Sequence, residues 1–328
     1  MKTLNLTLIA ITLIAVLTVG CKKHENSFLI KAKNTKEFGQ LYGAQKQTHQ
    51  VDASALPKTI TLAGGSKITF PAGSLTKGGV AVSGTVVVEA YEMLKRSAVV
   101  FSGSNTNHIS GAPLVSDGFI FVNVKSGGSS VDQNLAVPIK ISIPTNRSGV
   151  TQLWNGVAAD NGQPLAAEDD AQMAWEAPKA ANGQQGREVA AIDNAFTFNF
   201  GNLGWINCDV FYSYTNPKTT VTVQVNNNPG TFANFRGFSG ETFVFFCAKG
   251  SNVAAQLYTP DGPNKVKSYD NMMPTGVEGK MLAFSIKDGK FYYAEQEITI
   301  TASQAITLNL AETTEAHIQN AINSLDTY

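Results

Sequence analysis

The most reactive side chains of this sequence are its three cysteines, Cys21, Cys208 and Cys247. If Cys21 is consumed by another reaction, Cys208 and Cys247 remain as an even pair. In an oxidising compartment such a pair can form a disulfide, provided that its Cα atoms lie within about 7 Å. Free cysteine is also among the most buried residue types and packs as a small apolar group. Both cysteines lie in apolar, strand-like sequence, so the spacing alone leaves a disulfide and two buried thiols open.

Other residues with catalytic or metal-binding chemistry do not form a recognisable set. The four histidines are scattered along the chain, and no Gly-x-Ser-x-Gly, His-Glu-x-x-His or phosphate-loop pattern occurs. Glu168-Asp169-Asp170 offers clustered oxygens of the kind that calcium prefers, but without the spacing of a calcium loop. We therefore expect a solvated loop there, and we assign no catalytic residue, metal or cofactor.

One aromatic cluster could bind a ligand. Phe232, Phe235 and Phe238 recur every three residues beside Arg236, between two expected strands. An aromatic loop of this kind can hold a sugar or a partner protein. The alternative is that the rings fold back into the core. The cluster is the candidate ligand patch of the sequence.

The N-terminal residues have the pattern of an export signal. Lys2 precedes an apolar run from Leu4 to Val19, followed by Gly20 and Cys21. A positive start, a short apolar stretch and a small residue before the cut are typical of a secretory signal. At about sixteen residues, the run is shorter than the roughly 20 that span a bilayer. Residues 17–21 (Leu-Thr-Val-Gly-Cys) resemble a bacterial lipobox, although Thr18 stands where that motif prefers Leu. We expect cleavage before Cys21 and acylation of its thiol, which would anchor the protein stably to a membrane.

Composition argues against a nucleic-acid partner. Loss of Lys2 with residues 1–20 leaves 24 basic against 25 acidic side chains, whereas nucleic-acid-binding domains are strongly basic. Charged residues make up 15% of the chain, below the usual ~25%. Ser, Thr, Asn, Gln and Gly take their place, as is typical of an exported β protein.

The remaining chain predicts β domains joined by polar segments. A polar tether is expected over residues 21–56, since this stretch has little apolar periodicity. Short runs of alternating polar and apolar residues then predict strands over 57–145 and again over 205–311. Residues 146–204 are expected to hold connecting strands and an irregular insertion. Residues 312–328 predict a short helix, capped by Thr313 or Thr314, with Ile318, Ala321, Ile322 and Leu325 on its apolar face.

The sequence around Pro71 carries a family resemblance. Residues 66–75 (Ser-Lys-Ile-Thr-Phe-Pro-Ala-Gly-Ser-Leu) resemble the signature of the ZU5 domain, with Phe70 in place of a proline. Residues 137–144 are similar to the closing strand of that domain. A group of Bacteroidetes envelope lipoproteins is closer still, because its recurring segments resemble residues 114–119, 141–145, 152–156 and 203–209. That resemblance covers roughly residues 56–310, and it implies a fold and a location but no activity.

The resemblance bears on two of the candidate sites. Some relatives of ZU5 cut their own backbone at a His-Phe-Ser or His-Leu-Thr, and His108-Ile109-Ser110 is similar to that motif. In that reaction the histidine acts as base while the hydroxyl attacks the preceding carbonyl. We expect an ordinary loop instead, because the surrounding residues are rich in Gly, Ser and Asn. Cys208 falls in a recurring segment whereas Cys247 does not, which favours two buried thiols over a disulfide.

Together these patterns predict a mainly β protein of two β-sandwich-like domains, ZU5-like and then Ig- or transthyretin-like, with a short C-terminal helix. We expect a non-enzymatic outer-membrane lipoprotein, on the periplasmic face or the cell surface. It would serve as a binding, adhesion or scaffold module for an envelope protein or glycan, with the membrane as its second partner. The alternative is a glycan-active or self-cleaving envelope enzyme.

Overall fold

The computed structural model describes residues 31–178 and 188–328. Strands take up 49% of the described residues and helices 11%, so the mainly β prediction is confirmed. Three α-helices are present in the described residues: α1 (Thr35–Tyr42), α2 (Arg96–Phe101) and α3 (Glu315–Ser324). None of them is long and apolar enough to cross a membrane.

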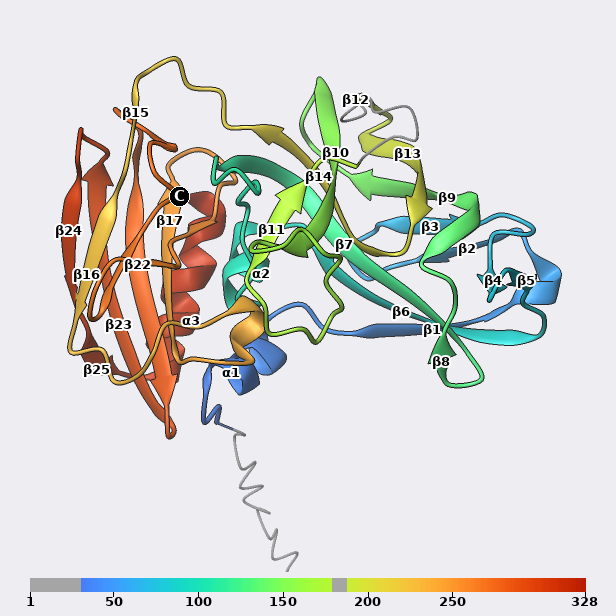
Figure 1. Cartoon of the computed structure of the whole chain (residues 1–328), viewed down its shortest axis with the longest axis horizontal. Coiled ribbons are helices and arrows are strands. Elements are labelled where there is room, and N and C mark those ends of the chain that lie inside the picture. Colours follow the sequence, from blue (N-terminus) through green and yellow to red (C-terminus); the bar gives the residue numbers. More distant parts are fainter. Residues whose placement is uncertain (1–30, 179–187) are drawn as a thin grey trace, which may run out of the picture. The chain divides into compact units, whose positions relative to one another are not determined.

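The first half of the chain folds into two β-layers around one apolar core (Figure 1). One layer has the strand order β1 (Gln47–Asp52), β6 (Thr85–Met93), β7 (Leu114–Ser126), β14 (Gly204–Phe211) and β10 (Val150–Ala158). β12 (Glu188–Ile192) connects it to the other layer, β13 (Ala195–Asn202), β9 (Asn134–Pro144), β3 (Lys67–Phe70) and β2 (Lys58–Thr61). β8 (Ser129–Ser130) and β11 (Met173–Glu176) pair with β7 and β10, and β4 (Thr76–Lys77) pairs with β5 (Val80–Ala81).

The C-terminal half forms a second pair of β-layers. A five-stranded sheet runs β18 (Ala255–Gln256), β17 (Thr242–Ala248), β22 (Glu278–Lys287), β23 (Lys290–Thr299) and β25 (Ala311–Thr313). A four-stranded sheet faces it across a second core, in the order β19 (Thr259–Pro260), β20 (Lys265–Lys267), β16 (Thr222–Asn226) and β24 (Ala305–Asn309). β15 (Lys218–Thr219) pairs with β21 (Met273–Pro274).

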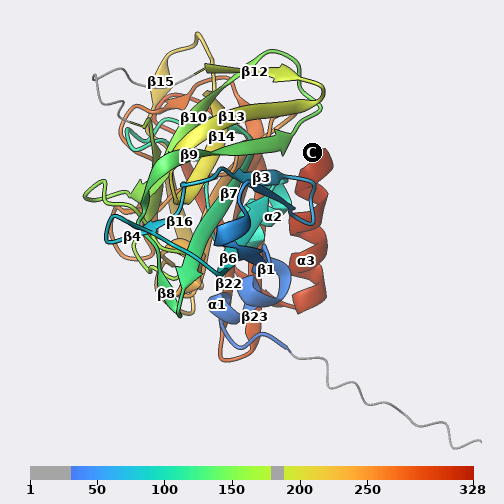
Figure 2. The ribbon, with the colours of Figure 1, turned by 90° about the vertical axis from the view of Figure 1, so that its right-hand side faces the viewer.

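A third core joins the two halves. Alternate residues of β17, namely Phe243, Phe245 and Cys247, belong to this core, whereas Val244 and Phe246 between them belong to the C-terminal core. The sheet is therefore covered on both faces, which explains why β17 is buried throughout and apolar from Phe243 to Ala248. Trp205 from β14 lies in the same joining core. The three helices fill its edge, with α3 against α2 and β23 (Figure 2).

Local sequence signals account for several element ends. Thr314 caps α3 by accepting the His317 N–H at 3.2 Å, which confirms one of the two expected caps. Asp288 and Gly289, with φ of 53° and 72°, make the tight turn between β22 and β23. Both positions need a positive φ, which explains the Asp-Gly pair.

Two of the expected segment boundaries are wrong. Residues 31–56 are not a tether, because they form α1 and β1, and Phe38 is fully buried in the joining core. The second β domain does not begin at residue 205, since β14 pairs with β7 and β10 of the first half. Its strands start at β15. Residues 1–30, which include the expected signal and Cys21, lie outside the described residues.

Candidate functional site

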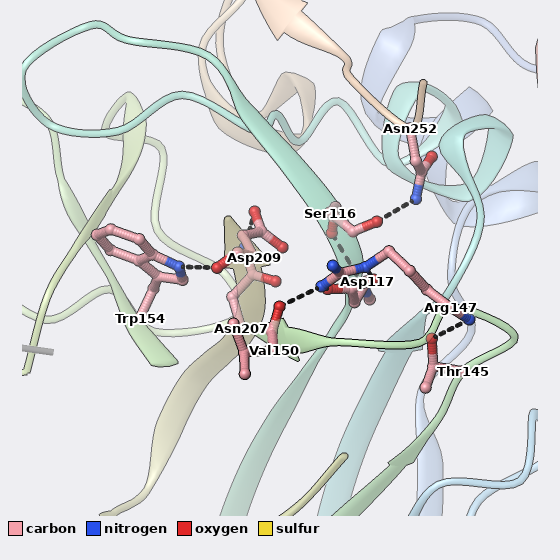
Figure 3. A network of polar contacts seen from close by, with 10 residues as sticks. Ser116, Asp117, Thr145, Arg147, Val150, Trp154, Asn207, Asp209 and Asn252 are labelled. Atoms are coloured by element: carbon pink, nitrogen blue, oxygen red, sulfur yellow. Dashed lines mark hydrogen bonds and ion pairs between the residues drawn. The ribbon is translucent and has the colours of Figure 1, made fainter. Parts of the chain in front are cut away.

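A buried carboxyl group, Asp209, lies at the centre of a polar network on β14 (Figure 3). The side-chain amide of Asn207 donates to Asp209 Oδ2 at 2.6 Å, and Trp154 Nε1 donates to the Asp209 main-chain oxygen at 2.9 Å. The Ser116 hydroxyl and the Asp117 backbone N–H also donate to the carboxyl group. Asp209 Oδ1 accepts no hydrogen bond from the described residues. The carboxyl is therefore buried and only partly satisfied.

Burial changes the protonation of Asp209. Desolvation raises the pKa of Asp209 to about 8, and the neighbouring Asp117 charge adds to the rise, while hydrogen bonds from Ser116 and Asn207 oppose it. A buried carboxylate is costly because no water stabilises its charge. At neutral pH the group is mostly protonated and acts as a neutral polar side chain.

Asp117, beside it, carries a compensated charge. Arg147 Nε and Nη2 bind the two oxygens of Asp117 at 2.7 and 2.5 Å, and Nη2 also donates to the Val150 carbonyl at 2.8 Å. The hydrogen bond with Asp117 raises the pKa of Arg147. Such a two-point pair fixes both side chains.

A backbone bulge brings these groups together. The register between β14 and β7 shifts between Asn207 and Asp209, opposite Ser116, Asp117 and Gly118. Gly118 has a φ of 115°, and a Cβ there would lie 2.7 Å from Leu94 Cδ2. Asn252 of the C-terminal half completes the network. Its side-chain amide donates to the Ser116 main-chain carbonyl at 2.8 Å, and its main-chain carbonyl accepts from the Ser116 N–H at 3.0 Å.

A polar cleft of about 700 Å³ opens in front of this network, and a second of about 550 Å³ adjoins it, sharing residues 94–95 and 250–252. Apart from the exposed Lys95, the charged side chains of the clefts are already bonded within the protein. Arg147 holds Asp117, and Asp326 accepts from the Ser97 N–H and hydroxyl, both at 2.8 Å. Glycoside hydrolysis needs two carboxyl groups free to act on one bond. In these clefts Asp117 and Asp326 are instead bonded to groups of the protein itself, where the two halves of the chain meet.

A different hollow, of about 380 Å³, has three aromatic residues in its lining, and we call it the aromatic groove. Its lining is Ser110, Ala112, Pro113, Phe211, Tyr212, Ser213, Tyr214, Lys218, Met272 and Pro274. Phe211 and Tyr214 are 43% and 38% exposed. They are the two exposed aromatic side chains among the residues that the structure describes.

Several contacts hold the aromatic groove in shape. The rings of Tyr212 and Tyr214 are nearly parallel, at 8° with centroids 5.9 Å apart. Phe211 packs edge-on against Trp154 at 5.2 Å and against His108 at 5.0 Å. Trp154 is itself bonded to Asp209, so the base of the groove rests on the buried polar network. Rings fixed in this way lose little conformational entropy when a ligand binds.

The expected loop at His108 is confirmed. The Gly111 N–H donates to the His108 carbonyl at 2.7 Å, which makes residues 108–111 a tight turn. His108 Nδ1 lies 2.7 Å from Ser110 Oγ and accepts the Ser110 N–H at 3.1 Å. Burial lowers the pKa of His108, although Glu176 opposes the shift.

The structure does not gather the predicted aromatic cluster into an exposed patch. Phe235 is fully buried, edge-on to Trp205 at 5.6 Å, and Phe232 packs against the C-terminal core. Arg236 lies 4.4 Å above the ring of Tyr91, and Lys36 covers Phe238 at 4.6 Å. Spacing by three suggested that the rings share one face, but Phe235 fills the joining core while Phe232 packs on the C-terminal core. The candidate ligand patch is therefore wrong as an exposed surface.

Cys208 and Cys247 are both free and fully buried. They lie in different cores, Cys208 between the layers of the first half and Cys247 in the joining core. Two buried thiols were the favoured expectation, and the structure agrees. Near the acidic run, Asp169 accepts the Ala166 N–H at 2.6 Å. The described residues contain no group of three or more His, Cys, Asp or Glu side chains suited to a metal.

Sequence reasoning missed the aromatic groove. Its local signal was residues 210–214 (Val-Phe-Tyr-Ser-Tyr), an aromatic-rich strand end before a polar loop. No family model and no curated protein matches the chain at a significant level.

Proposed function

We propose that the chain is a non-enzymatic binding protein of a bacterial envelope, held to the outer membrane by lipid on Cys21. The lipobox-like residues 17–21 and the resemblance to envelope lipoproteins with a ZU5-like domain support this location. ZU5 domains elsewhere serve mainly as protein-binding and scaffold modules, which favours binding over catalysis. The proposal covers both the periplasmic face and the cell surface.

The observation that carries the binding proposal is the aromatic groove. Both exposed aromatic side chains of the described residues, Phe211 and Tyr214, line this one hollow. Exposed apolar surface gathered in a concave site is typical of ligand binding. Tyrosine suits such a site because its ring is rigid and apolar while its hydroxyl can hydrogen-bond.

A glycan fits the aromatic groove better than a protein partner does. A sugar ring has an apolar face that stacks on aromatic rings and hydroxyls that bond to groups such as Ser110 and Ser213. The volume of this hollow, about 380 Å³, lies within the range typical of small-ligand sites, about 300–1,000 Å³. Lys218 is the one charged residue of its lining, which favours neutral or acidic glycans.

A glycan array probed with the full lipidated protein in detergent tests this proposal. The double substitution Phe211→Ala/Tyr214→Ala should weaken binding to the recognised glycans at least ~10-fold, about 1.4 kcal/mol. Val80→Ala/Ile192→Ala is the matched control, because both residues are exposed and lie outside the groove. Absence of any glycan signal, or an equal signal from the double variant, would overturn the proposal.

One observation favours a second candidate, self-cleavage. His108 Nδ1 lies 2.7 Å from Ser110 Oγ, a distance at which a neutral imidazole can take a hydroxyl proton. The intact mass of the purified protein decides between the candidates. Cleavage is established if the natural protein gives one fragment that ends at Ile109 and one that begins at Ser110, while Ser110→Ala stays a single chain. A single chain in both the natural protein and Ser110→Ala excludes it.

A further inference from the structure

A separate cavity of about 310 Å³ lies on the face of β6 and β7 that points away from the first core. Strand residues form its floor, and residues 164–168 of the irregular insertion form one wall. We call it the lysine cavity, after Lys46 and Lys125 at its edge. Its volume is at the lower end of the range typical of small-molecule sites, about 300–1,000 Å³. It shares no lining residue with the aromatic groove.

The wall of the lysine cavity is fixed by contacts to the joining core. Leu165 is buried in that core. Arg236 Nη1 donates to the Ala167 carbonyl at 2.7 Å, and Trp205 Nε1 donates to the Ala166 carbonyl at 3.4 Å. The cavity is therefore formed before a ligand arrives, which lowers the entropic cost of binding.

The two lysines at the edge share a single carboxylate. Lys125 Nζ lies 2.9 Å from Glu89 Oε2, whereas Lys46 Nζ lies 3.7 Å from Glu89 Oε1, beyond hydrogen-bond distance. Burial alone would raise the pKa of Glu89, but the hydrogen bond and charge of Lys125 and the charge of Lys46 lower it overall. Glu89 is thus ionised and neutralises one ammonium group. The Lys46 ammonium keeps this longer contact with Glu89, but 44% of its side chain is exposed, so it can also bind another anion. Glu168, which is exposed, also lines the cavity, but it forms no ion pair with Lys46.

The floor of the lysine cavity is aromatic. The rings of Tyr91 and Phe121 lie 6.0 Å apart at an angle of 61°. Pro164, Leu165, Ala166 and Ala167 face them from the insertion. An apolar floor beside an ammonium group suits a ligand that combines a ring with a negative charge.

We propose that the lysine cavity binds a small carboxylate carried on a six-membered ring. The carboxylate pairs with the Lys46 ammonium, and the ring packs on Phe121 and on the part of Tyr91 that Arg236 leaves uncovered. A sugar acid and an aromatic acid share this chemistry. The site is independent of the aromatic groove, so either can exist without the other.

Calorimetric titration of the full lipidated protein in detergent tests the assignment. The probes are galacturonate and 4-hydroxybenzoate, each compared with its neutral counterpart, galactose or 4-hydroxybenzyl alcohol. We expect one acid to bind at least ~10-fold more tightly than its counterpart, and which acid does so distinguishes a sugar source from an aromatic one. Equal affinity for acid and counterpart in both pairs, or no binding of either acid at millimolar concentration, would overturn the proposal.

Two substitutions locate the binding. Lys46→Gln removes the free ammonium group and should weaken acid binding at least ~10-fold, whereas Lys58→Gln, on the outward side of β2, should leave it unchanged. Ala166→Phe narrows the cavity from an exposed wall position and should abolish binding of acid and counterpart alike. Full acid binding by both Lys46→Gln and Ala166→Phe would place the ligand elsewhere and refute the site.

Discussion

Asn207 and Asp209, two residues apart on β14, are joined by a hydrogen bond of 2.6 Å between fully buried side chains. Each keeps one oxygen, Oδ1, without a hydrogen-bond partner among the described residues. Leaving buried polar atoms unpaired typically costs about 1–3 kcal/mol each. This pair lies beneath both the polar cleft and the aromatic groove, where the two halves of the chain meet.

Stability should fall as pH rises because of Asp209. Its pKa is raised from 3.8 unfolded to about 8 folded, so between these values the folded state holds a proton that the unfolded state releases. The contribution of Asp209 to stability is full below about pH 4. It decreases by about 1.4 kcal/mol for each pH unit up to about 8 and is then constant.

The substitution Asp209→Asn should remove this slope, because an amide has no proton to lose. Urea unfolding at pH 5, 7 and 9 measures the slope, with the exposed Asp160→Asn as control. We expect Asp209→Asn to gain stability relative to the natural protein as pH rises, while Asp160→Asn follows the natural profile. A constant difference between Asp209→Asn and the natural protein at all three pH values would show that Asp209 is ionised when folded.

Phe38→Ala should destabilise the whole protein. Phe38 is fully buried, with ring centroids 5.8 Å from Phe101, 6.0 Å from Phe284 and 6.4 Å from Phe291. Deleting such a ring leaves a cavity and typically costs 3–5 kcal/mol. Chemical denaturation measures the loss, and Leu41→Ala, exposed on the same helix, should cost less than ~1 kcal/mol. Equal small losses from both would mean that α1 contributes little to the fold.

α1 also shows why the N-terminal segment was predicted as a tether. Residues 31–56 are rich in Lys, Gln, Asn and Thr, and the helical spacing of Phe38, Leu41 and Tyr42 lasts for a single turn. Apart from Tyr42, the aromatic partners of the Phe38 ring lie 63 to 253 positions away in the chain, from Phe101 to Phe291. A local pattern cannot reveal such partners, whereas Asp288-Gly289 specifies its turn through its own backbone preferences.

β7 shows a related limit of sequence reasoning. Strands were predicted over residues 57–145, and β7 is one of them, extending from Leu114 to Ser126. In a regular strand, residues an odd number of positions apart point to opposite faces of the sheet. The bulge near Gly118 interrupts this alternation, so Leu114 and Phe119, five positions apart, both point into the joining core. The aromatic groove depends on the same long-range pairing, since it unites Ser110, Phe211 and Met272. Strand existence is a local property, whereas the groove exists only once the sheets have paired.

Arg96→Met should destabilise the C-terminal helix. Arg96 is 4% exposed, and it donates through Nε to the Leu325 carbonyl at 2.8 Å and through Nη1 to the Ser251 carbonyl at 2.8 Å. Hydrogen bonds from a charged group contribute about 1.5–3 kcal/mol each, so a loss of roughly 3 kcal/mol or more is expected on urea unfolding. Limited proteolysis should then cleave within residues 312–328 first. Arg96→Lys serves as a comparison and should recover part of the stability, because one ammonium cannot bond all of these carbonyls.

Both core cysteines should resist alkylation in the folded protein. Burial raises the pKa of Cys247 to about 12 and that of Cys208 well above its usual value, and the thiolate is the reactive form. Mass spectrometry after alkylation without reductant should find neither residue modified in the native state and both modified in denaturant. Protection of both residues in denaturant would instead indicate a disulfide.

Lipidation at Cys21 is the prediction on which the proposed location depends. Acyl chains add about 0.8 kcal/mol of membrane affinity for each buried CH₂, and two or more chains hold a protein stably. Cys21→Ser should therefore prevent incorporation of labelled fatty acid and leave the protein either unprocessed or in the soluble fraction. Cys208→Ala is the matched control, because it removes a thiol that lies fully buried in the first core and should leave labelling intact. If Cys21→Ser still carried label and still partitioned into the detergent phase, the anchor would have to lie elsewhere in the chain.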